Sequence, residues 1–223
     1  TLMLVSGAFG VFRRREVIAV GGFTKGSMGE DLDLIIKLHR HLITVRQPYR
    51  IQFIPEPVCW TEAPSTLAVL GRQRSRWQRG ALEVFFRYGH MFLNPRYGRV
   101  GIFGYGHMFI VDVMGPIMEV LGYILMPLFW ALGVLDLDFL LAFTALAFTY
   151  GTFVSVAPLV LAQAELKRPP RARAPPFLFA AAVPDTFGYF QLNHLWRLKA
   201  SRPDPALDQS CGRISAAGVR PAP

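Results

Sequence analysis

Two long apolar stretches in the second half of the chain constrain its fold more than any other feature. Residues 101–135 are nearly all apolar, and residues 137–161 form a second stretch of the same kind. An α-helix rises about 1.5 Å per residue, so about 20 apolar residues cross the roughly 30 Å hydrocarbon core of a bilayer. The composition agrees, because 52% of the residues are hydrophobic and only 17% are charged. We therefore predict a membrane-embedded α-helical region over residues 100–200, in which these two stretches are spans.

The charges around the two predicted spans indicate their orientation. The chain has a formal net charge of +9, and its basic residues gather on the same side of both spans. They are Arg96 and Arg99 before the first span, and Lys167, Arg168, Arg171 and Arg173 after the second. The intervening loop carries Asp136 and Asp138. Since cytoplasmic loops are enriched in Lys and Arg, this pattern predicts a multi-pass protein of the plasma (inner) membrane with its N-terminal part in the cytoplasm.

The remaining segments of the second half carry weaker signals. A third apolar segment, residues 176–190, has a length between that of a span and that of a re-entrant helix, so its topology stays open. Residues 201–223 are rich in Pro, Ala, Ser and Arg without periodicity, which predicts a disordered tail. Cys59 and Cys211 lack any ligand spacing, and the sequence therefore predicts neither a disulfide framework nor a metal site.

The first half of the chain has the mixed patterning of an α/β domain. Short apolar runs bounded by Gly and Pro predict strands at residues 2–5, 8–12, 43–45 and 51–54. Segments with one apolar face predict helices at residues 13–18, 30–41 and 65–92, the last capped by Ser65. Residues 1–64 are thus predicted to be part of an α/β domain, and residues 65–99 an interfacial helical region before the spans.

Asp31 is the carboxylate best placed for chemistry. It follows a glycine-containing loop at the start of a predicted helix, where the helix dipole favours its ionised form. An accessible carboxylate there can act as a general base that accepts a proton from a hydroxyl. The alternative is an acidic residue that only stabilises the helix start. Glu30 lies about 100° around the helix from Asp31, and Asp33 is predicted to be a solvated helix residue.

An arginine-rich helix carries the second set of candidate residues. Gln73, Arg76 and Trp77 fall within an arc of about 100°, whereas Arg74 points away from that arc. An amide, a cation and an indole in one patch can bind an anionic group beside a sugar ring, because Arg matches phosphate oxygens. The alternative is a solvated basic helix attracted to anionic lipids at a membrane surface. Nucleic acid is excluded as a partner, because the segment leads directly into the spans.

Three short motifs, taken in order, resemble those of one family. They are Ser6-Gly7-Ala8-Phe9, Gly29-Glu30-Asp31 and Gln73-Arg74-Ser75-Arg76-Trp77, and the apolar stretches follow them. Together they resemble the processive family-2 glycosyltransferases, a group that includes the synthases of cellulose, chitin, hyaluronan and poly-N-acetylglucosamine. The resemblance covers residues 1–199 and is strongest over residues 6–80. It implies that the chain is a C-terminal fragment, with residues 1–64 the end of a glycosyltransferase A-type catalytic domain.

The resemblance also implies a role for each candidate residue. Asp31 would be the catalytic base of an inverting transfer, in which an acceptor hydroxyl attacks the anomeric carbon of a nucleotide-diphosphate sugar. Arg76 would stabilise the departing diphosphate, and Trp77 would stack on the acceptor. Gln73, Ser6 and Gly7 would also bind the substrate, and Glu30 and Arg74 would be supporting residues. The implied partners are the nucleotide sugar, a polysaccharide or lipid-linked acceptor, and membrane lipids.

Two acidic residues interrupt the first predicted span. Asp112 and Glu119 would face the interior of the helix bundle, because a carboxylate in contact with lipid is costly. They would either line a path for the polymer or form interhelical hydrogen bonds.

Parts of the family pattern are missing from this chain. The aspartates that hold the uracil, and the Asp-x-Asp motif that binds a divalent metal (Mg or Mn), would precede Thr1. Since that metal neutralises the departing diphosphate, the chain alone is expected to be inactive. The tail from Ser201 also lacks the family's basic, Trp-containing ending. The alternatives are a non-processive transferase with a lipid acceptor and a non-catalytic membrane anchor of an envelope or secretion complex.

Overall fold

The computed structural model describes residues 2–3, 7, 9–54, 59, 61–165 and 188–200. The regular structure of these residues is helical, and no β-strand occurs among them. The chain divides into two compact units. The first comprises Thr1–Phe53, Val58–Gly115 and Trp196–Pro223, and the second Ile54–Pro57 and Pro116–Leu195.

The first unit begins with two helices that the sequence predicts. α1 spans Arg14–Ala19 and α2 spans Glu30–Thr44. The predicted apolar face of α2 is buried, as shown by Leu34, Ile35 and Leu38. A turn between the two helices contains Gly21 and Gly22, whose φ angles of 81° and 68° favour glycine.

The α/β character predicted for this region is not found in the described residues. The predicted strand at residues 43–45 is wrong, because α2 continues to Thr44 and buries Leu42 on the same face. The described residues of the other three predicted strands, 2–3, 9–12 and 51–54, have no strand structure. A strand forms only where a second extended segment pairs with its backbone, and short apolar runs do not reveal whether such a partner exists.

The long helix α3 spans Leu67–Arg87. Its N-cap is Thr66, whose hydroxyl accepts a hydrogen bond from the backbone N–H of Val69 at 3.3 Å, rather than the predicted Ser65. The predicted helix end at residue 92 is too late, because α3 gives way to two short 3₁₀ helices, η1 (Gly89–Met91) and η2 (Pro95–Tyr97).

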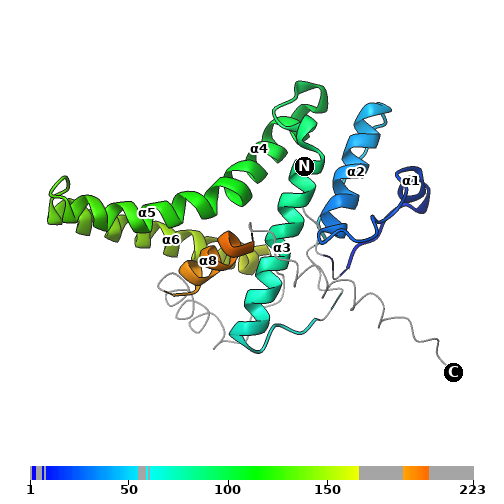
Figure 1. Ribbon diagram of the computed structural model, residues 1–223. Helices are drawn as coiled ribbons and strands as arrows, with labels where there is room; N and C mark the ends of the chain where they lie inside the picture. The colour runs from blue at the N-terminus through cyan, green and yellow to red at the C-terminus, as the bar shows by residue number, and fades with distance from the viewer. Residues whose placement is uncertain are drawn as a thin grey trace. The chain divides into compact units, whose positions relative to one another are not determined.

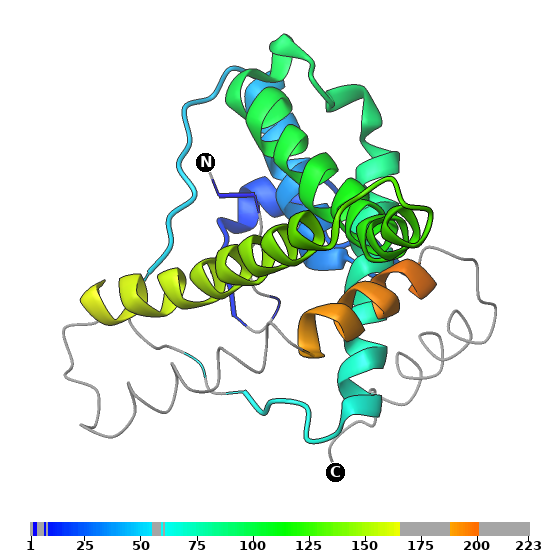
Figure 2. The same ribbon diagram turned by 90° about the vertical axis from the view of Figure 1, so that its left-hand side faces the viewer.

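A hydrophobic core joins α2 and α3 to the start of the first apolar stretch. That stretch begins with a π-helical turn η3 (Val100–Gly104), then α4 (Tyr105–Met108) and a second π-helical turn η4 (Phe109–Met114). The buried cluster consists of Leu32, Ile36, Val84, Phe85, Tyr88, Met91, Val100, Tyr105 and Met108. Figures 1 and 2 show α3 with α2 beside it and the end of α8 (Phe190–Ala200) on another side.

The second unit contains most of the apolar sequence. α5 spans Gly115–Ala131 and α6 spans Leu137–Glu165. Two segments, Val100–Ala131 and Leu137–Pro158, are long and apolar enough to cross a membrane, each with a mean hydropathy of 1.8. Most of their side chains are exposed, unlike those of a helix buried in the core of a soluble protein. The predicted third segment lies largely outside the described residues, and the predicted disordered tail lies wholly outside them.

Candidate functional site

Two glycines bring the start of α2 against the middle of α3. A Cβ atom added to Gly80 would lie 2.7 Å from the backbone N of Gly29 and 2.8 Å from its Cα. A Cβ atom added to Gly29 would lie 2.9 Å from the carbonyl oxygen of Gly80. All three distances are shorter than a Cβ atom tolerates against backbone. The two helices therefore approach this closely only because neither residue has a side chain.

Two polar contacts fix the same approach at further points of α3. The backbone N–H of Met28 donates to Oε2 of Glu83 at 3.1 Å. Arg87 donates from Nη1 to Oδ1 of Asp33 at 2.9 Å. Positions 80, 83 and 87 share one side of a helix, so the loop before α2 and its first turn are held along a single stripe of α3.

Asp33 is the centre of this contact, and the prediction that it is a solvated helix residue is wrong. Its relative exposure is 0%. Its carboxylate accepts hydrogen bonds from Thr24 Oγ1 at 2.5 Å and Tyr88 OH at 3.0 Å, and it pairs with Lys37 at 3.0 Å and with Arg87. Burial alone raises the pKa of Asp33, but the hydrogen bonds from Thr24, Lys37 and Arg87 outweigh burial and lower its pKa.

His39 secures the other end of α2. Its side chain is fully buried, with Nδ1 2.6 Å from Tyr49 OH and Nε2 2.9 Å from the carbonyl oxygen of Leu2. These contacts join to α2 the segments of Tyr49 and Leu2, which lie 10 and 37 residues from His39 in sequence. Burial lowers the pKa of His39, because the charged imidazolium would lose its hydration.

Asp31 lies in the first turn of α2, and its side chain is half-buried. Its Oδ1 accepts a hydrogen bond from the backbone N–H of Leu32 at 2.8 Å. Its Oδ2 faces Gly7, since a Cβ atom added to Gly7 would lie 2.8 Å from that oxygen. The structure thus brings together Asp31 and Gly7, two of the predicted site residues. Ser6 lies outside the described residues, and Glu30 is exposed.

The candidate residues of α3 share the side of the helix that carries Gly80. Positions 73, 76, 77 and 80 follow the i, i+3, i+4, i+7 spacing of one face. Arg76 is exposed, Gln73 is half-buried, and the exposed fraction of Trp77 is 51%. Asp31 and Arg76 make no hydrogen bond with each other in the described part of the chain. What the structure brings together is the helix start before Asp31 and the motif face of α3.

Arg74 differs from the sequence-based expectation. Its guanidinium carbon lies 4.7 Å from the centroid of the Trp77 ring, in a cation–π contact. The prediction that Arg74 points away from the motif considered only the direction of the Cα–Cβ bond. The long side chain bends toward the indole instead. Arg74 therefore supports one face of the Trp77 ring.

The opposite side of α3 contacts the end of α8, a contact that local sequence patterns do not predict. Ser75 Oγ donates to the carbonyl oxygen of Trp196 at 3.2 Å, and Arg79 Nε donates to that of Ala200 at 3.1 Å. Gly71 also belongs to this side, and a Cβ atom there would lie 2.9 Å from the Trp196 indole. No local pattern distinguishes α8 as a docking helix, because these two bonds use its backbone carbonyl groups.

Asp112 anchors the first candidate span to α3 and α8. Gln78 Nε2 donates to the Asp112 carbonyl oxygen at 2.5 Å, and Arg197 pairs with the Asp112 carboxylate at 3.0 Å. Arg197 Nε also donates to Gln78 Oε1 at 2.6 Å. Pro116 has no N–H with which to bond the carbonyl four residues earlier, which is that of Asp112. The Asp112 carbonyl accepts a hydrogen bond from Gln78 instead. Of the two predicted alternatives for Asp112, the structure favours interhelical hydrogen bonding.

Glu119 belongs to the second unit and has a partner there. Its Oε2 lies 2.5 Å from Nε2 of His194 in α8. His194 is buried and stacks on Phe190 with ring centroids 6.3 Å apart. Glu119 is thus also held by an interhelical contact.

The described residues do not offer a metal site. No group of three or more His, Cys, Asp or Glu side chains among them could hold an ion. The acidic residues of the candidate site are either engaged in the Asp33 cluster or stand singly, as Asp31 does. A divalent metal therefore finds no fitting set of ligands in this part of the chain.

Comparisons with known proteins give a consistent family and a short region of closer similarity. Residues 1–156 match the family model described as "Glycosyl transferase family group 2". The poly-beta-1,6-N-acetyl-D-glucosamine synthase of Staphylococcus aureus (strain COL) is 36% identical over 83 residues, which are 37% of this chain and 19% of that protein. The synthase of the same name from Staphylococcus epidermidis is 32% identical over 83 residues, again 37% of this chain and 19% of the relative. No solved structure matches the chain.

Proposed function

Because the chain belongs to glycosyl transferase family group 2, we propose that it forms the acceptor side of a membrane-bound polysaccharide synthase. The whole enzyme transfers a sugar from a nucleotide-diphosphate sugar to a growing polymer with inversion at the anomeric carbon. The matched region spans 19% of the length of the curated relatives, so the activity belongs to the full-length protein. The single observation that carries the proposal is the Gly29–Gly80 contact, which joins the turn before Asp31 to the motif face of α3.

In the proposed reaction Asp31 is the general base. Its half-buried carboxylate accepts the proton of an acceptor hydroxyl as that oxygen attacks the anomeric carbon. The bond from the anomeric carbon to the diphosphate oxygen breaks, and the nucleoside diphosphate leaves with the bonding electron pair. The products are the acceptor longer by one sugar, the nucleoside diphosphate and a protonated Asp31. Inversion of an α-linked donor produces a β linkage.

Two residues of α3 complete the proposed site. The exposed guanidinium of Arg76 stabilises the negative charge that develops on the departing diphosphate. Trp77 offers an indole face to the acceptor sugar, with Gln73 on the same side of the helix. Arg74 supports the indole from the other face. The family uses a divalent metal, but the described residues provide no fitting ligands, and no step of the proposed reaction is assigned to one.

The names of the relatives support a proposal for the product class. The synthases of both Staphylococcus species are named for a β-linked polymer of N-acetylglucosamine. We assign the same chemical class, a β-linked N-acetylhexosamine polymer, to the full-length protein. The two candidate spans and the basic residues that flank them support a multi-pass placement in the plasma (inner) membrane, with the catalytic part in the cytoplasm.

The proposed base is tested by Asp31→Asn in the full-length protein, assayed in membranes with a labelled nucleotide sugar. Loss of a general base lowers the rate by about 10²–10⁴-fold, while binding of the nucleotide sugar is retained. Asp136→Asn, at an exposed carboxylate in the loop between α5 and α6, is the control and keeps its activity. Turnover of Asp31→Asn at the wild-type rate would refute the proposal and favour the membrane-anchor alternative.

A further inference from the structure

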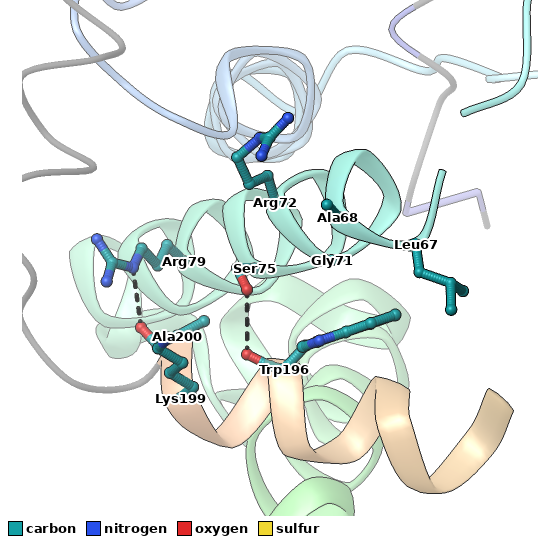
Figure 3. A pocket seen from close by; sticks show the side chains of 9 residues that line it. All are labelled: Leu67, Ala68, Gly71, Arg72, Ser75, Arg79, Trp196, Lys199 and Ala200. Carbon is teal, nitrogen blue, oxygen red and sulfur yellow. Dashed lines mark hydrogen bonds between the residues drawn. The ribbon is translucent and has the colours of Figure 1, made fainter. Parts of the chain in front are cut away.

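A groove of about 200 Å³ lies between α3 and the end of α8. Figure 3 shows it from close by, with α3 as one wall and α8 as the other. Gly71 and Ser75, which line it from α3, lie on the side opposite Gln73 and Trp77, while Arg79 lies one turn from Arg76. Most of the groove therefore faces away from the proposed sugar-transfer site.

Hydrogen bonds from α3 side chains to backbone carbonyl groups of α8 hold the two walls of the groove in place. The bonds from Ser75 to the Trp196 carbonyl and from Arg79 to the Ala200 carbonyl hold α8 against α3 along one full turn. Between these two helices the Trp196 indole lies across Gly71, where a Cβ atom would be 3.0 Å from the indole nitrogen. The absence of a side chain at Gly71 leaves room for the ring.

The two ends of the groove differ in polarity. Figure 3 shows Arg79 and Lys199 at one end, and the Trp196 ring extending toward Leu67 at the other. Leu67 is 63% exposed. None of the nine residues that line the groove is acidic. The Arg72 guanidinium points away from α8 (Figure 3) and is not part of the cationic end.

The groove adjoins the point where the first candidate span leaves the protein core. Val100, Tyr105 and Met108 in that span are buried, whereas Phe103, Ile110 and Val111 are 71%, 66% and 43% exposed. Asp112 follows at once, and it is bonded to Gln78 and Arg197, the sequence neighbours of Arg79 and Trp196. The span carries exposed apolar side chains from Ile102 onward, and it is long and apolar enough to cross a membrane, so the groove lies beside a segment that a bilayer would surround.

We propose that the α3–α8 groove binds an anionic phospholipid. Its phosphate contacts Arg79 and Lys199, since guanidinium and ammonium groups form charge-assisted hydrogen bonds with phosphate oxygens. Its glycerol and the first part of its acyl chains lie along Trp196 and Leu67. The groove has a cationic end and an exposed apolar end. It therefore matches a phospholipid, whose phosphate is attached to an apolar body, better than it matches a free phosphate ion.

The test uses the full-length protein in nanodiscs of phosphatidylcholine that contain increasing amounts of phosphatidylglycerol with brominated acyl chains. Bromine quenches tryptophan fluorescence at contact, and the difference between wild type and Trp196→Phe reports quenching at Trp196. Brominated phosphatidylglycerol is expected to quench Trp196 at a lower mole fraction than brominated phosphatidylcholine does. Lys199→Glu is expected to reduce this preference on the order of tenfold, because each basic residue near an anionic lipid surface contributes severalfold.

Controls separate the groove from general electrostatics and from free phosphate. Lys25→Glu changes the net charge equally at an exposed loop position, and it is expected to keep the preference. Lys199→Gln is expected to reduce the preference for phosphatidylglycerol less than Lys199→Glu does. It replaces Lys199→Glu in the test if the charge reversal disturbs folding. Equal quenching by both lipids, or equal losses in Lys199→Glu and Lys25→Glu, would overturn the proposal. The proposal would also be overturned if inorganic phosphate occupied the groove and the brominated anionic lipid did not quench Trp196.

Discussion

The two sides of α3 are attached to the rest of the first unit by different means. Toward α2 the contact is steric and ionic, made by the Gly29–Gly80 pair and the buried Asp33 cluster. Toward α8 it includes side-chain hydrogen bonds to backbone carbonyl groups, such as that from Ser75, beside the Arg197–Gln78 bond and the packing of Trp196 on Gly71. A carbonyl group is present whatever the residue, so the bonds to carbonyl groups constrain the sequence of α8 little. The first contact tolerates neither an added atom nor a lost charge, which suits the side that carries the candidate site.

This difference predicts the largest loss of stability for Asp33→Asn. The substitution removes, at a fully buried position, the anionic partner of Lys37 and one of the two anionic partners of Arg87, which also pairs with Glu83. Loss of one member of a buried ion pair costs about 3–5 kcal/mol of unfolding free energy. Denaturant unfolding of the detergent-solubilised protein measures the effect, with Asp136→Asn in the loop between α5 and α6 as the control. A loss as small as that of the control would mean that the cluster does not hold α2 to α3.

Gly80→Ala tests the steric part of the same contact. The new Cβ would lie 2.7–2.9 Å from backbone atoms of Gly29 and Met28, which cannot move aside as a flexible side chain can. Overpacking of this kind costs about 1–3 kcal/mol, and sugar transfer is expected to fall further than stability because the start of α2 shifts. Gly122→Ala in α5, where no atom lies within 4 Å, is the matched control, and helix propensity predicts a neutral or stabilising effect there. Full activity of Gly80→Ala would separate the glycine contact from the site.

The pH dependence of stability tests the far end of α2. Burial lowers the pKa of His39 below its ordinary value of 6.5, so the unfolded chain binds a proton more readily than the folded chain does. The stability is therefore fully present above pH 6.5 and declines as the pH falls below it. Thermal midpoints measured between about pH 7.5 and 5.5 check this decline. His39→Gln should flatten it and His90→Gln, at an exposed site, should not; equal profiles for all three proteins would contradict the assignment.

The α2 side could be predicted from sequence further than the α8 side. The helix start at Glu30, the buried Leu34 and Ile35, and the length of the apolar stretches all follow from local periodicity. Asp33 could not be recognised as buried, because Thr24, Arg87 and Tyr88 lie 9, 54 and 55 residues away along the chain. The pairing of Arg197 with Asp112 joins residues 85 apart. One signal was available, since a glycine within a long helix, as at Gly80, is costly unless another backbone needs the space.

The smallest effect is expected on the α8 side, for Ser75→Ala. The substitution removes one hydrogen bond to the Trp196 carbonyl but leaves the Arg79 bond to Ala200 in place. A hydrogen bond of this kind contributes about 0.5–1.5 kcal/mol, and alanine is the better helix former, which offsets part of the loss. Denaturant unfolding gives the change in stability, and the sugar-transfer assay should show an unchanged rate because Asp31 lies on the other side of α3. A rate loss comparable to that of Gly80→Ala would show that the two sides of the helix act as one, and the distinction between them would fail.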